Sequence, residues 1–284
     1  MRQICVHHAG CPDGFGAAWA TWRGWGRQGE FIARGHEDRL RGKEVEDAFV
    51  AFVDIAPQNR ELIELAEHAA QIVVLDHHVT ASTRLLGDPE VCAAVEEYGH
   101  TLHFDMQHSG AVLAWKHFQP EEPLPALLEY VEDQDLWNWK LSHSDAVNAA
   151  ISSHPHTLET WETLSQLPIS ELVRQGEPIL RANEVEIQRA VTKAAPIVIG
   201  EKRLEAVNST TNRARIGHIL AERSLFGEPW GCVYRLEGQV VSGTLYSIGD
   251  FDVAKIATAL GGGGHKNAAG FSVSLQRWLA DFTL

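Results

Sequence analysis

The sequence predicts an α/β protein with two domains, a parallel, doubly wound N-terminal domain and a smaller α/β C-terminal domain, joined by a connecting helix. Three observations support this prediction. Short apolar strands alternate with helical patterns, as in parallel sheets covered by helices. Several of these segments end in Asp or His. A long helical pattern separates an acidic region from a nearly neutral one, which places the domains and the helix at residues 1–168, 169–195 and 196–284.

The central strand of the N-terminal domain is predicted at residues 72–75, four branched apolar residues followed by Asp76, His77 and His78. Such an uninterrupted apolar run is typical of a strand that is buried on both faces of a parallel sheet. Open α/β sheets bind their ligands at the carboxyl ends of the strands. These three polar residues are therefore predicted to lie at the ligand-binding edge.

The same pattern recurs in three other segments: an apolar strand at residues 4–6, a second at 48–53, and an apolar, helical segment at 127–137. A turn and a helix with small residues follow the first strand, and a helix follows the second. The polar residues that end these segments, or follow them in a turn, are His7, His8, Asp13, Asp54, Asp133 and Asp135.

Carboxylates and imidazoles without a pair of thiols suit Mn²⁺ or Mg²⁺ better than structural zinc. Two such ions that share a carboxylate lower the pKa of a water and neutralise a phosphoryl group under attack. We therefore predict a two-metal phosphoesterase centre rather than a coincidental group of core and surface residues.

The composition predicts a soluble, cytoplasmic protein. The chain has 284 residues, of which 44% are hydrophobic. No apolar run reaches the roughly 18 residues of a membrane span, and the N-terminus lacks the pattern of a signal peptide. The four cysteines show no Cys-x-x-Cys spacing, so neither a disulfide framework nor a zinc knuckle is expected.

The formal net charge of −14 is unevenly distributed. Residues 1–194 carry 15 basic and 30 acidic side chains, whereas residues 195–284 carry nine and eight. An acidic surface repels polyanions, so a long nucleic acid duplex is not an expected partner. A small phosphorylated ligand bound through metal ions is easier to accommodate.

The polar residues lie in four ordered motifs, and a glycine-rich segment follows in the C-terminal region. The motifs resemble those of the DHH phosphoesterase superfamily, and the glycine-rich segment resembles the signature of its associated C-terminal domain. Members include RecJ-like nucleases, oligoribonucleases, cyclic dinucleotide phosphodiesterases and phosphoanhydride hydrolases. The resemblance implies two Mn²⁺ ions and an active site in the cleft between two domains. The matching residues are 11–18, 53–54, 75–78, 132–135 and 261–271.

The resemblance also implies a role for each metal ligand. Asp54 would be the carboxylate that bridges the two ions. His77 and Asp133 would complete the ligands of one ion, and His8 and Asp13 would be ligands in the rest of the centre.

Two of these assignments have alternatives that spacing alone does not separate. His7 competes with His8, although strand alternation places His8 on the same face as Val6. Asp135 competes in the same way with Asp133.

Three further residues of these motifs have implied roles or depart from the pattern. His78 would face the phosphate, and Asp76 would hold a histidine in orientation, as such carboxylates do. Many relatives have an Asp where this chain has Cys11. Cys11 is interpreted as a small turn residue that weakens one metal site, with a thiolate ligand as the alternative.

The glycine-rich segment of the C-terminal domain is predicted to hold a phosphate. Glycines let backbone amides converge on an anion. Nuclease-like relatives often have an Arg where this chain has Tyr246, and a Tyr there would offer a base a ring to stack on. The predicted substrate-binding residues are Gly263, Gly264, His265, Asn267 and Tyr246.

The predicted function is hydrolysis of phosphodiester bonds in dinucleotides or short single-stranded oligonucleotides by a water that two metal ions activate. The alternatives are a polyphosphate-type phosphoanhydride hydrolase and a catalytically weak nucleotide-binding sensor. The expected cofactor is Mn²⁺, with Mg²⁺ as a substitute. A homodimer is compatible with the sequence, and no membrane partner is expected.

Overall fold

The computed structural model of the protein describes residues 1–26, 28–35 and 38–283. The chain divides into two compact units, Met1–Leu180 and Arg181–Leu284. This division falls inside a single helix, α9 (Ile169–Val191), which lies within the segment predicted to connect the domains. No helix among the described residues combines the length and the apolar character needed to cross a membrane.

The first unit contains a five-stranded sheet in the order β2-β1-β3-β4-β5, in which every neighbouring pair is parallel. This order and these parallel pairs confirm the predicted α/β class with a parallel sheet. The strands are β1 (Gln3–His8), β2 (Glu30–Arg34), β3 (Phe49–Val53), β4 (Gln71–Asp76) and β5 (Thr101–Phe104).

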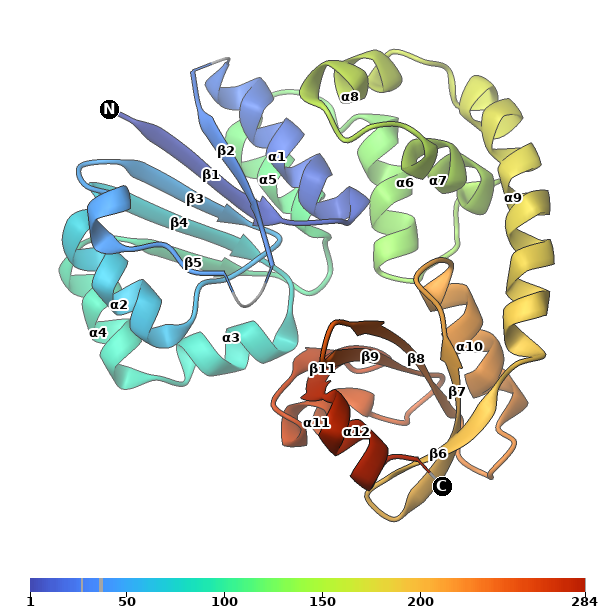
Figure 1. Ribbon diagram of the computed structural model, residues 1–284. Coiled ribbons are helices and arrows are strands. Elements are labelled where there is room, and N and C mark those ends of the chain that lie inside the picture. Colours follow the sequence, from blue (N-terminus) through green and yellow to red (C-terminus); the bar gives the residue numbers. More distant parts are fainter. Residues whose placement is uncertain (27, 36–37, 284) are drawn as a thin grey trace. The chain divides into compact units, whose positions relative to one another are not determined.

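Helices cover both faces of this sheet (Figure 1). Each face has its own hydrophobic core, because alternate residues of a strand point to opposite faces. Cys5 and Val53 pack in one core, and Val6 and Phe52 pack in the other. The first core is completed by α1 (Pro12–Trp25), α5 (Gly110–Phe118), α6 (Ala126–Asp135), α7 (Ser144–Ser153) and α8 (Leu158–Ser165). The second core is completed by α2 (Asn59–His68), α3 (Val79–Leu86) and α4 (Pro89–Glu97), and by Leu40 and Val45 on either side of the short helix η1 (Gly42–Glu44).

The winding of the sheet reverses between β1 and β3. The helix after β1, α1, lies on one face, and the helix after β3, α2, lies on the other (Figure 1). Sheets wound in this way bind ligands at the carboxyl ends of the two strands at the reversal. The topology therefore directs attention to the residues that follow β1 and β3.

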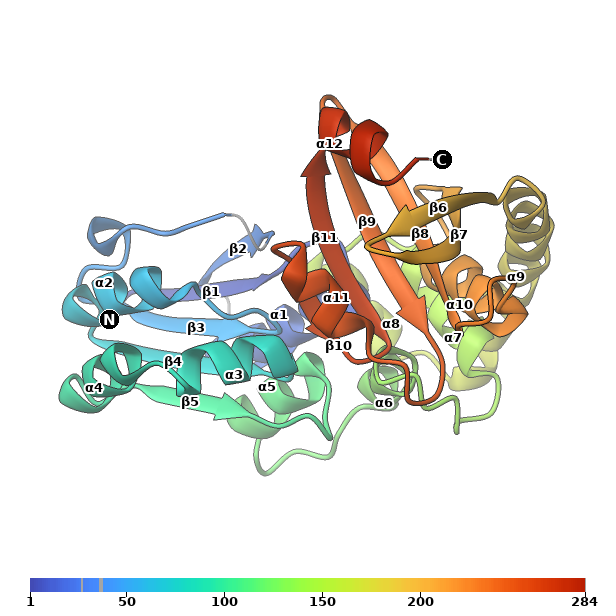
Figure 2. The ribbon, with the colours of Figure 1, turned by 90° about the horizontal axis from the view of Figure 1, so that it is seen from below.

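The second unit contains a six-stranded mixed sheet in the order β10-β11-β9-β8-β7-β6. Within this sheet, β7 and β8 are the only described strands that pair in parallel. One face packs on α11 (Val253–Ala259) and α12 (Leu275–Asp281), and the other packs on α10 (Arg213–Arg223) and the end of α9 (Figure 2). The strands are β6 (Ala195–Ile199), β7 (Lys202–Asn208), β8 (Trp230–Glu237), β9 (Val240–Ser247), β10 (Gly263–His265) and β11 (Ala268–Ser274).

Candidate metal centre

The polar residues of the first unit meet at the carboxyl edge of the parallel sheet. His8 is the last residue of β1, Asp54 directly follows β3, and His77 directly follows β4. Because β1, β3 and β4 are neighbours and run in the same direction, their ends bring these side chains together.

Asp54 is at the centre of the group. Its Oδ1 lies 3.0 Å from Nε2 of His77, and its Oδ2 lies 3.4 Å from Nδ1 of His8. Cys11 Sγ lies 3.5 Å from the same Oδ2. The Asp54 carboxylate is buried, with 2% of the side chain exposed. The backbone there is left-handed (φ 56°), a conformation that Asp and Asn tolerate better than most residues.

Asp13, in the first turn of α1, is held by the N-terminus of α5. The amide of Gly110 donates to Oδ2 at 2.8 Å, and the amide of Ala111 donates to Oδ1 at 3.0 Å. The same Oδ2 lies 3.6 Å from Nε2 of His77. Two amide donors at a helix N-terminus hold a carboxylate firmly, so Asp13 has a fixed position beside His77.

Gly110 is a functional residue that the sequence analysis missed. A Cβ at this position would overlap the side chain of Asp54 and lie 2.8 Å from its Cα and 2.9 Å from its Cγ. Real Cβ atoms do not approach other atoms that closely. Only glycine at the start of α5 lets this helix approach Asp54 without displacing it.

The two aspartates of α6 have different surroundings. Asp133 is 5% exposed, and its carboxylate accepts hydrogen bonds from the amides of Lys140 (2.8 Å) and Leu141 (3.2 Å). Asp135 instead places Oδ2 3.5 Å from Nε2 of His77. Residues two apart on a helix point in nearly opposite directions. The structure thus brings Asp135, and not the preferred Asp133, to the other site residues.

We expect the conservative variants of these two residues to behave differently. Asp135→Asn should weaken divalent-cation binding by roughly 10–100-fold, because a negative oxygen beside His77 is lost. Asp133→Asn should lower the free energy of unfolding by about 1–3 kcal/mol, because its hydrogen bonds to the two amides weaken. Calorimetric metal titration and urea unfolding of both variants would check this. The reverse pattern would restore Asp133 as the ligand.

The two histidines of the first motif also separate. His8 faces Asp54 and lies 3.3 Å from Cys11 Sγ through its Nδ1. His7 is 6% exposed as a residue, and its ring packs edge-on against Phe15 with 5.7 Å between the ring centroids. The structure therefore places His8 with the site.

Asp76 and His78 form a pair next to the group. Oδ1 of Asp76 lies 2.6 Å from Nδ1 of His78 and accepts hydrogen bonds from the amides of His77 and His78. The other oxygen, Oδ2, is buried and has no hydrogen bond partner among the described residues. Asp76 thus fixes the ring of His78 and retains acceptor capacity of its own.

The proximity of several buried carboxylates shifts their pKa values. Burial, followed by the charges of Asp54 and Asp135, raises the pKa of Asp13 well above its usual range. Burial alone lowers the pKa of His77, but the hydrogen bond with Asp54 and the charge of Asp135 raise it to about 10. Burial alone raises the pKa of Asp54, but His77 and His8 hold it well below its usual range. A proton on His77 thus offsets part of the negative charge of the carboxylates.

This donor set fits divalent cations. Within the described residues of the first unit, three groups of side chains have ligand atoms that all lie within 4.8 Å of one another. A cation would take the place of the protons, since ligands bind metals in their deprotonated forms. The groups are Asp54-Asp76-His77-His78, His8-Cys11-Asp54 and Asp13-His77-Asp135.

The first unit also has a pocket of about 410 Å³ that shares His8 with the candidate metal centre. The ring of Phe15 stacks on the ring of His156, with 5.3 Å between centroids, and Phe31 lines another part of the wall. Its remaining lining residues are His7, Gly10, Ala33, Thr157, Leu158 and Glu159.

The residues predicted to bind substrate in the second unit have structural partners. The ring of Tyr246 is 6% exposed and packs closely on Gly217 of α10, so it presents no free face for a base. The side-chain amide of Asn267 donates to Oγ of Ser247 (2.9 Å) and to the carbonyl of Gly249 (3.2 Å). The burial of Tyr246 therefore contradicts the prediction that a base stacks on its ring. The hydrogen bonds of Asn267 show that its side chain supports the neighbouring loop.

The glycine-rich segment forms a β-strand at the edge of the sheet rather than an open loop. Gly263–His265 is β10, paired with β11. The amides of Gly261 and Gly262 donate to carbonyls at the end of α11. A Cβ at Gly264 would lie 2.7 Å from the carbonyl oxygen of Ala268. Close packing of the two strands therefore explains part of the requirement for glycine.

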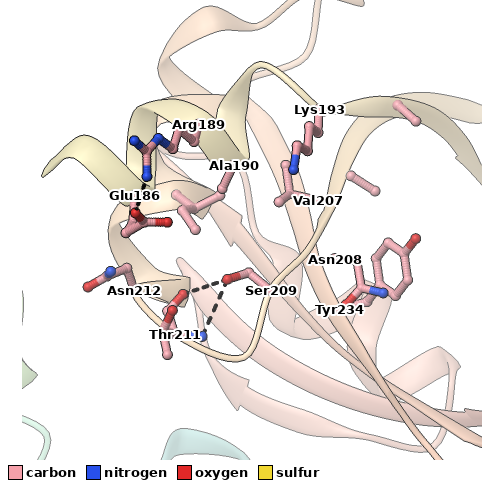
Figure 3. Close-up of a pocket in the computed structure, with 13 residues that line it drawn as sticks. Glu186, Arg189, Ala190, Lys193, Val207, Asn208, Ser209, Thr211, Asn212 and Tyr234 are labelled. Atoms are coloured by element: carbon pink, nitrogen blue, oxygen red, sulfur yellow. Dashed lines mark hydrogen bonds and ion pairs between the residues drawn. The ribbon is translucent and has the colours of Figure 1, made fainter. Parts of the chain in front are cut away.

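The second unit has a pocket of its own, of about 310 Å³, beside the end of α9 (Figure 3). In it Arg189 pairs with Glu186 at 2.6 Å, and Ser209 Oγ donates to the carbonyl of Thr211 at 2.8 Å. None of the predicted substrate-binding residues lines it among the residues that the structure describes.

No protein-family model matches the chain. An uncharacterized protein of Acanthamoeba polyphaga mimivirus is 25% identical over an alignment 293 residues long. The alignment covers 96% of this chain and 68% of that protein. The chain is also similar to the structure of RecJ in complex with Mn²⁺ from Thermus thermophilus. The TM-score is 0.48 and the identity 15%, with 98% of this chain and 50% of RecJ covered.

Two further solved structures are similar to the chain. The pGpG-specific phosphodiesterase PggH of Vibrio cholerae has a TM-score of 0.42 and 10% identity, with 98% of this chain and 94% of that chain covered. An exopolyphosphatase-related protein of Bacteroides fragilis has a TM-score of 0.43 and 13% identity, with 95% and 86% covered.

Proposed function

We propose that the protein is a metal-dependent phosphodiesterase that acts on dinucleotides or short single-stranded oligonucleotides. The observation that carries this proposal is the position of Asp54, whose two carboxylate oxygens face His77 on one side and His8 on the other. A carboxylate with ligand groups on both sides is suited to hold two cations. Divalent cations held there would supply an acidified water and would neutralise the charge of a phosphoryl group.

The side chains of the first unit would act as follows. Asp54 would bridge the two cation positions, with His8 on one side and with His77, Asp13 and Asp135 on the other. Mn²⁺ or Mg²⁺ suits the carboxylates and imidazoles of the latter set. His78, which is oriented by its hydrogen bond with Asp76, would donate to a phosphate oxygen.

The pocket of the first unit that shares His8 with the candidate metal centre, here called the aromatic pocket, favours a nucleotide over polyphosphate. A substrate phosphate beside His8 would place its nucleoside within reach of a pocket whose walls include Phe15, Phe31 and His156. Aromatic side chains bind bases by stacking, at about 1–3 kcal/mol per base, whereas polyphosphate has no group that such walls would bind. In the second unit, Gly263, Gly264 and His265 remain proposed phosphate-binding residues.

Hydrolysis of a substrate panel with and without Mn²⁺ tests this function. The panel contains a linear dinucleotide, a 5-mer RNA, a long single strand and polyphosphate. Mn²⁺-dependent preference for the dinucleotide or the 5-mer is the expected result. Cleavage of polyphosphate alone would favour the phosphoanhydride hydrolase, and metal binding without turnover of any substrate would favour a nucleotide sensor.

Filling the aromatic pocket should affect only substrates that carry a base. Ala33 lines the pocket from β2 and is exposed, so Ala33→Trp should be tolerated by the fold. We expect the KM for the dinucleotide to rise about tenfold or more, the equivalent of one lost stacking contact. Hydrolysis of methyl p-nitrophenyl phosphate and the activity of the control Ala33→Ser should stay unchanged. Equal losses on both substrates would remove the pocket from the proposal.

A further inference from the structure

The side chain of Cys11 lies among the candidate metal ligands. Its Sγ is 3.3 Å from Nδ1 of His8 and 3.5 Å from Oδ2 of Asp54. The ligand atoms of these three residues all lie within 4.8 Å of one another. They therefore form a complete three-donor group with one nitrogen, one oxygen and one sulfur.

This group differs in chemistry from its neighbour. Asp13, His77 and Asp135 offer only oxygen and nitrogen donors. Soft thiolate ligands favour Zn²⁺ and similar cations, whereas carboxylates favour Mn²⁺ and Mg²⁺. Two adjacent positions with such different donors would not be expected to select the same metal.

Helix capping alone does not explain a cysteine at this position. Cys11 is the N-cap of α1, and its Sγ accepts a hydrogen bond from the amide of Gly14 at 3.2 Å. Ser, Thr, Asp and Asn are the preferred N-cap residues because oxygen is the better acceptor. What sulfur adds is affinity for a soft cation.

Buried carboxylate groups around the sulfur supply an independent reason for a cation here. Asp54 and Asp13 are each 2% exposed. Asp76, which has a ligand atom within 4.8 Å of one of Asp54, has a buried Oδ2 without a hydrogen bond partner among the described residues. Buried carboxylates at this density need positive charge to offset their desolvation.

We propose that the Cys11 thiolate is a metal ligand, and that the position formed by His8, Cys11 and Asp54 binds a thiophilic divalent cation such as Zn²⁺. The neighbouring position of Asp13, His77 and Asp135 binds Mn²⁺ or Mg²⁺, so the centre contains two different metals. This inference rests on the two-cation centre of the proposed function. It replaces the interpretation of Cys11 as a turn residue that only weakens one site.

Cobalt titration of the metal-free, full-length protein tests the sulfur ligand directly. Co²⁺ bound to a thiolate gives a near-ultraviolet charge-transfer band that Co²⁺ bound to oxygen and nitrogen lacks. We expect the band in the wild-type protein and in the control Cys92→Ser, because Cys92 is exposed and belongs to none of the donor groups. Cys11→Ser and Cys11→Asp should lack the band.

Zinc affinity gives a second readout that does not depend on catalysis. In Cys11→Ser it should fall by more than the roughly 10–100-fold that loss of a residue supporting a ligand costs. Cys11→Asp should lower the ratio of bound zinc to bound manganese in elemental analysis of protein loaded with both metals. If either variant fails to fold, X-ray absorption of the zinc-loaded wild type should still show sulfur at about 2.3 Å.

The possible failures are distinguishable. Cobalt binding to the wild type without a charge-transfer band, or zinc bound without sulfur, would overturn the thiolate ligand and leave the two-cation centre intact. The absence of any bound metal in the wild type would overturn both the thiolate ligand and the proposed centre.

Discussion

Asp54→Asn is expected to lower phosphodiester hydrolysis by about 10³-fold, the upper range for loss of one preorganised electrostatic group in an active site. The Asp54 carboxylate belongs to two of the three ligand groups of the first unit, so its neutralisation weakens cation binding on both sides. Asn keeps the size of the side chain and tolerates the left-handed backbone at φ 56°. Asp54→Ala should be equally inactive, but it adds backbone strain that Asn avoids.

The chain offers a closely matched control. Asp47 also has a left-handed backbone, with φ 53°, and lies in the first unit, but it is exposed. Asp47→Asn should therefore leave both the hydrolytic rate and the metal content unchanged. Turnover numbers at saturating Mn²⁺, together with calorimetric metal titrations, would check both variants. An Asp54→Asn protein with a wild-type rate would disprove the metal assignment.

The sequence predicted the strands that carry the site because each is an apolar run that ends abruptly in Asp or His. It did not predict β2 or β5. These strands lie at the two edges of the sheet and are partly exposed, so they contain charged or polar residues that weaken the apolar pattern. Two walls of the aromatic pocket, Phe31 and Ala33, belong to β2, and the pocket was therefore not predicted either.

Other parts of the site depend on the direction in which a side chain points, which sequence spacing does not give. Asp133 and Asp135 both satisfy the motif, and only the orientation of α6 distinguishes them. The role of Gly110 follows from the approach of α5 to Asp54, a tertiary contact between segments that are far apart in the chain. Ser109 is a recognisable N-cap of the helix that follows it, but an N-cap does not indicate which distant residue the start of the helix will approach.

Gly110→Ala should lower activity by about 10²-fold without removing any ligand. Its Cβ would force Asp54 or the start of α5 to move, because the nearest atoms belong to the backbone and Cβ of Asp54 rather than to a flexible side-chain end. A displacement of about 1 Å in an active site costs on the order of 10²-fold in rate. The amide of Gly110 also holds Asp13, so the same movement disturbs a second ligand. We expect Mn²⁺ affinity and turnover to fall together.

A stability loss alone would not produce this result, and Gly24→Ala separates the two effects. Gly24 lies in α1 at the far end from Asp13, and a Cβ there would lie 2.7 Å from Cβ and 2.9 Å from the carbonyl oxygen of Phe118. Both variants should unfold at lower urea concentrations, because overpacking typically costs about 1–3 kcal/mol. Only Gly110→Ala should lose metal affinity in the folded protein. If both variants kept wild-type metal affinity and turnover per folded molecule, Asp54 would not be positioned by α5, and the close approach of this helix would serve packing alone.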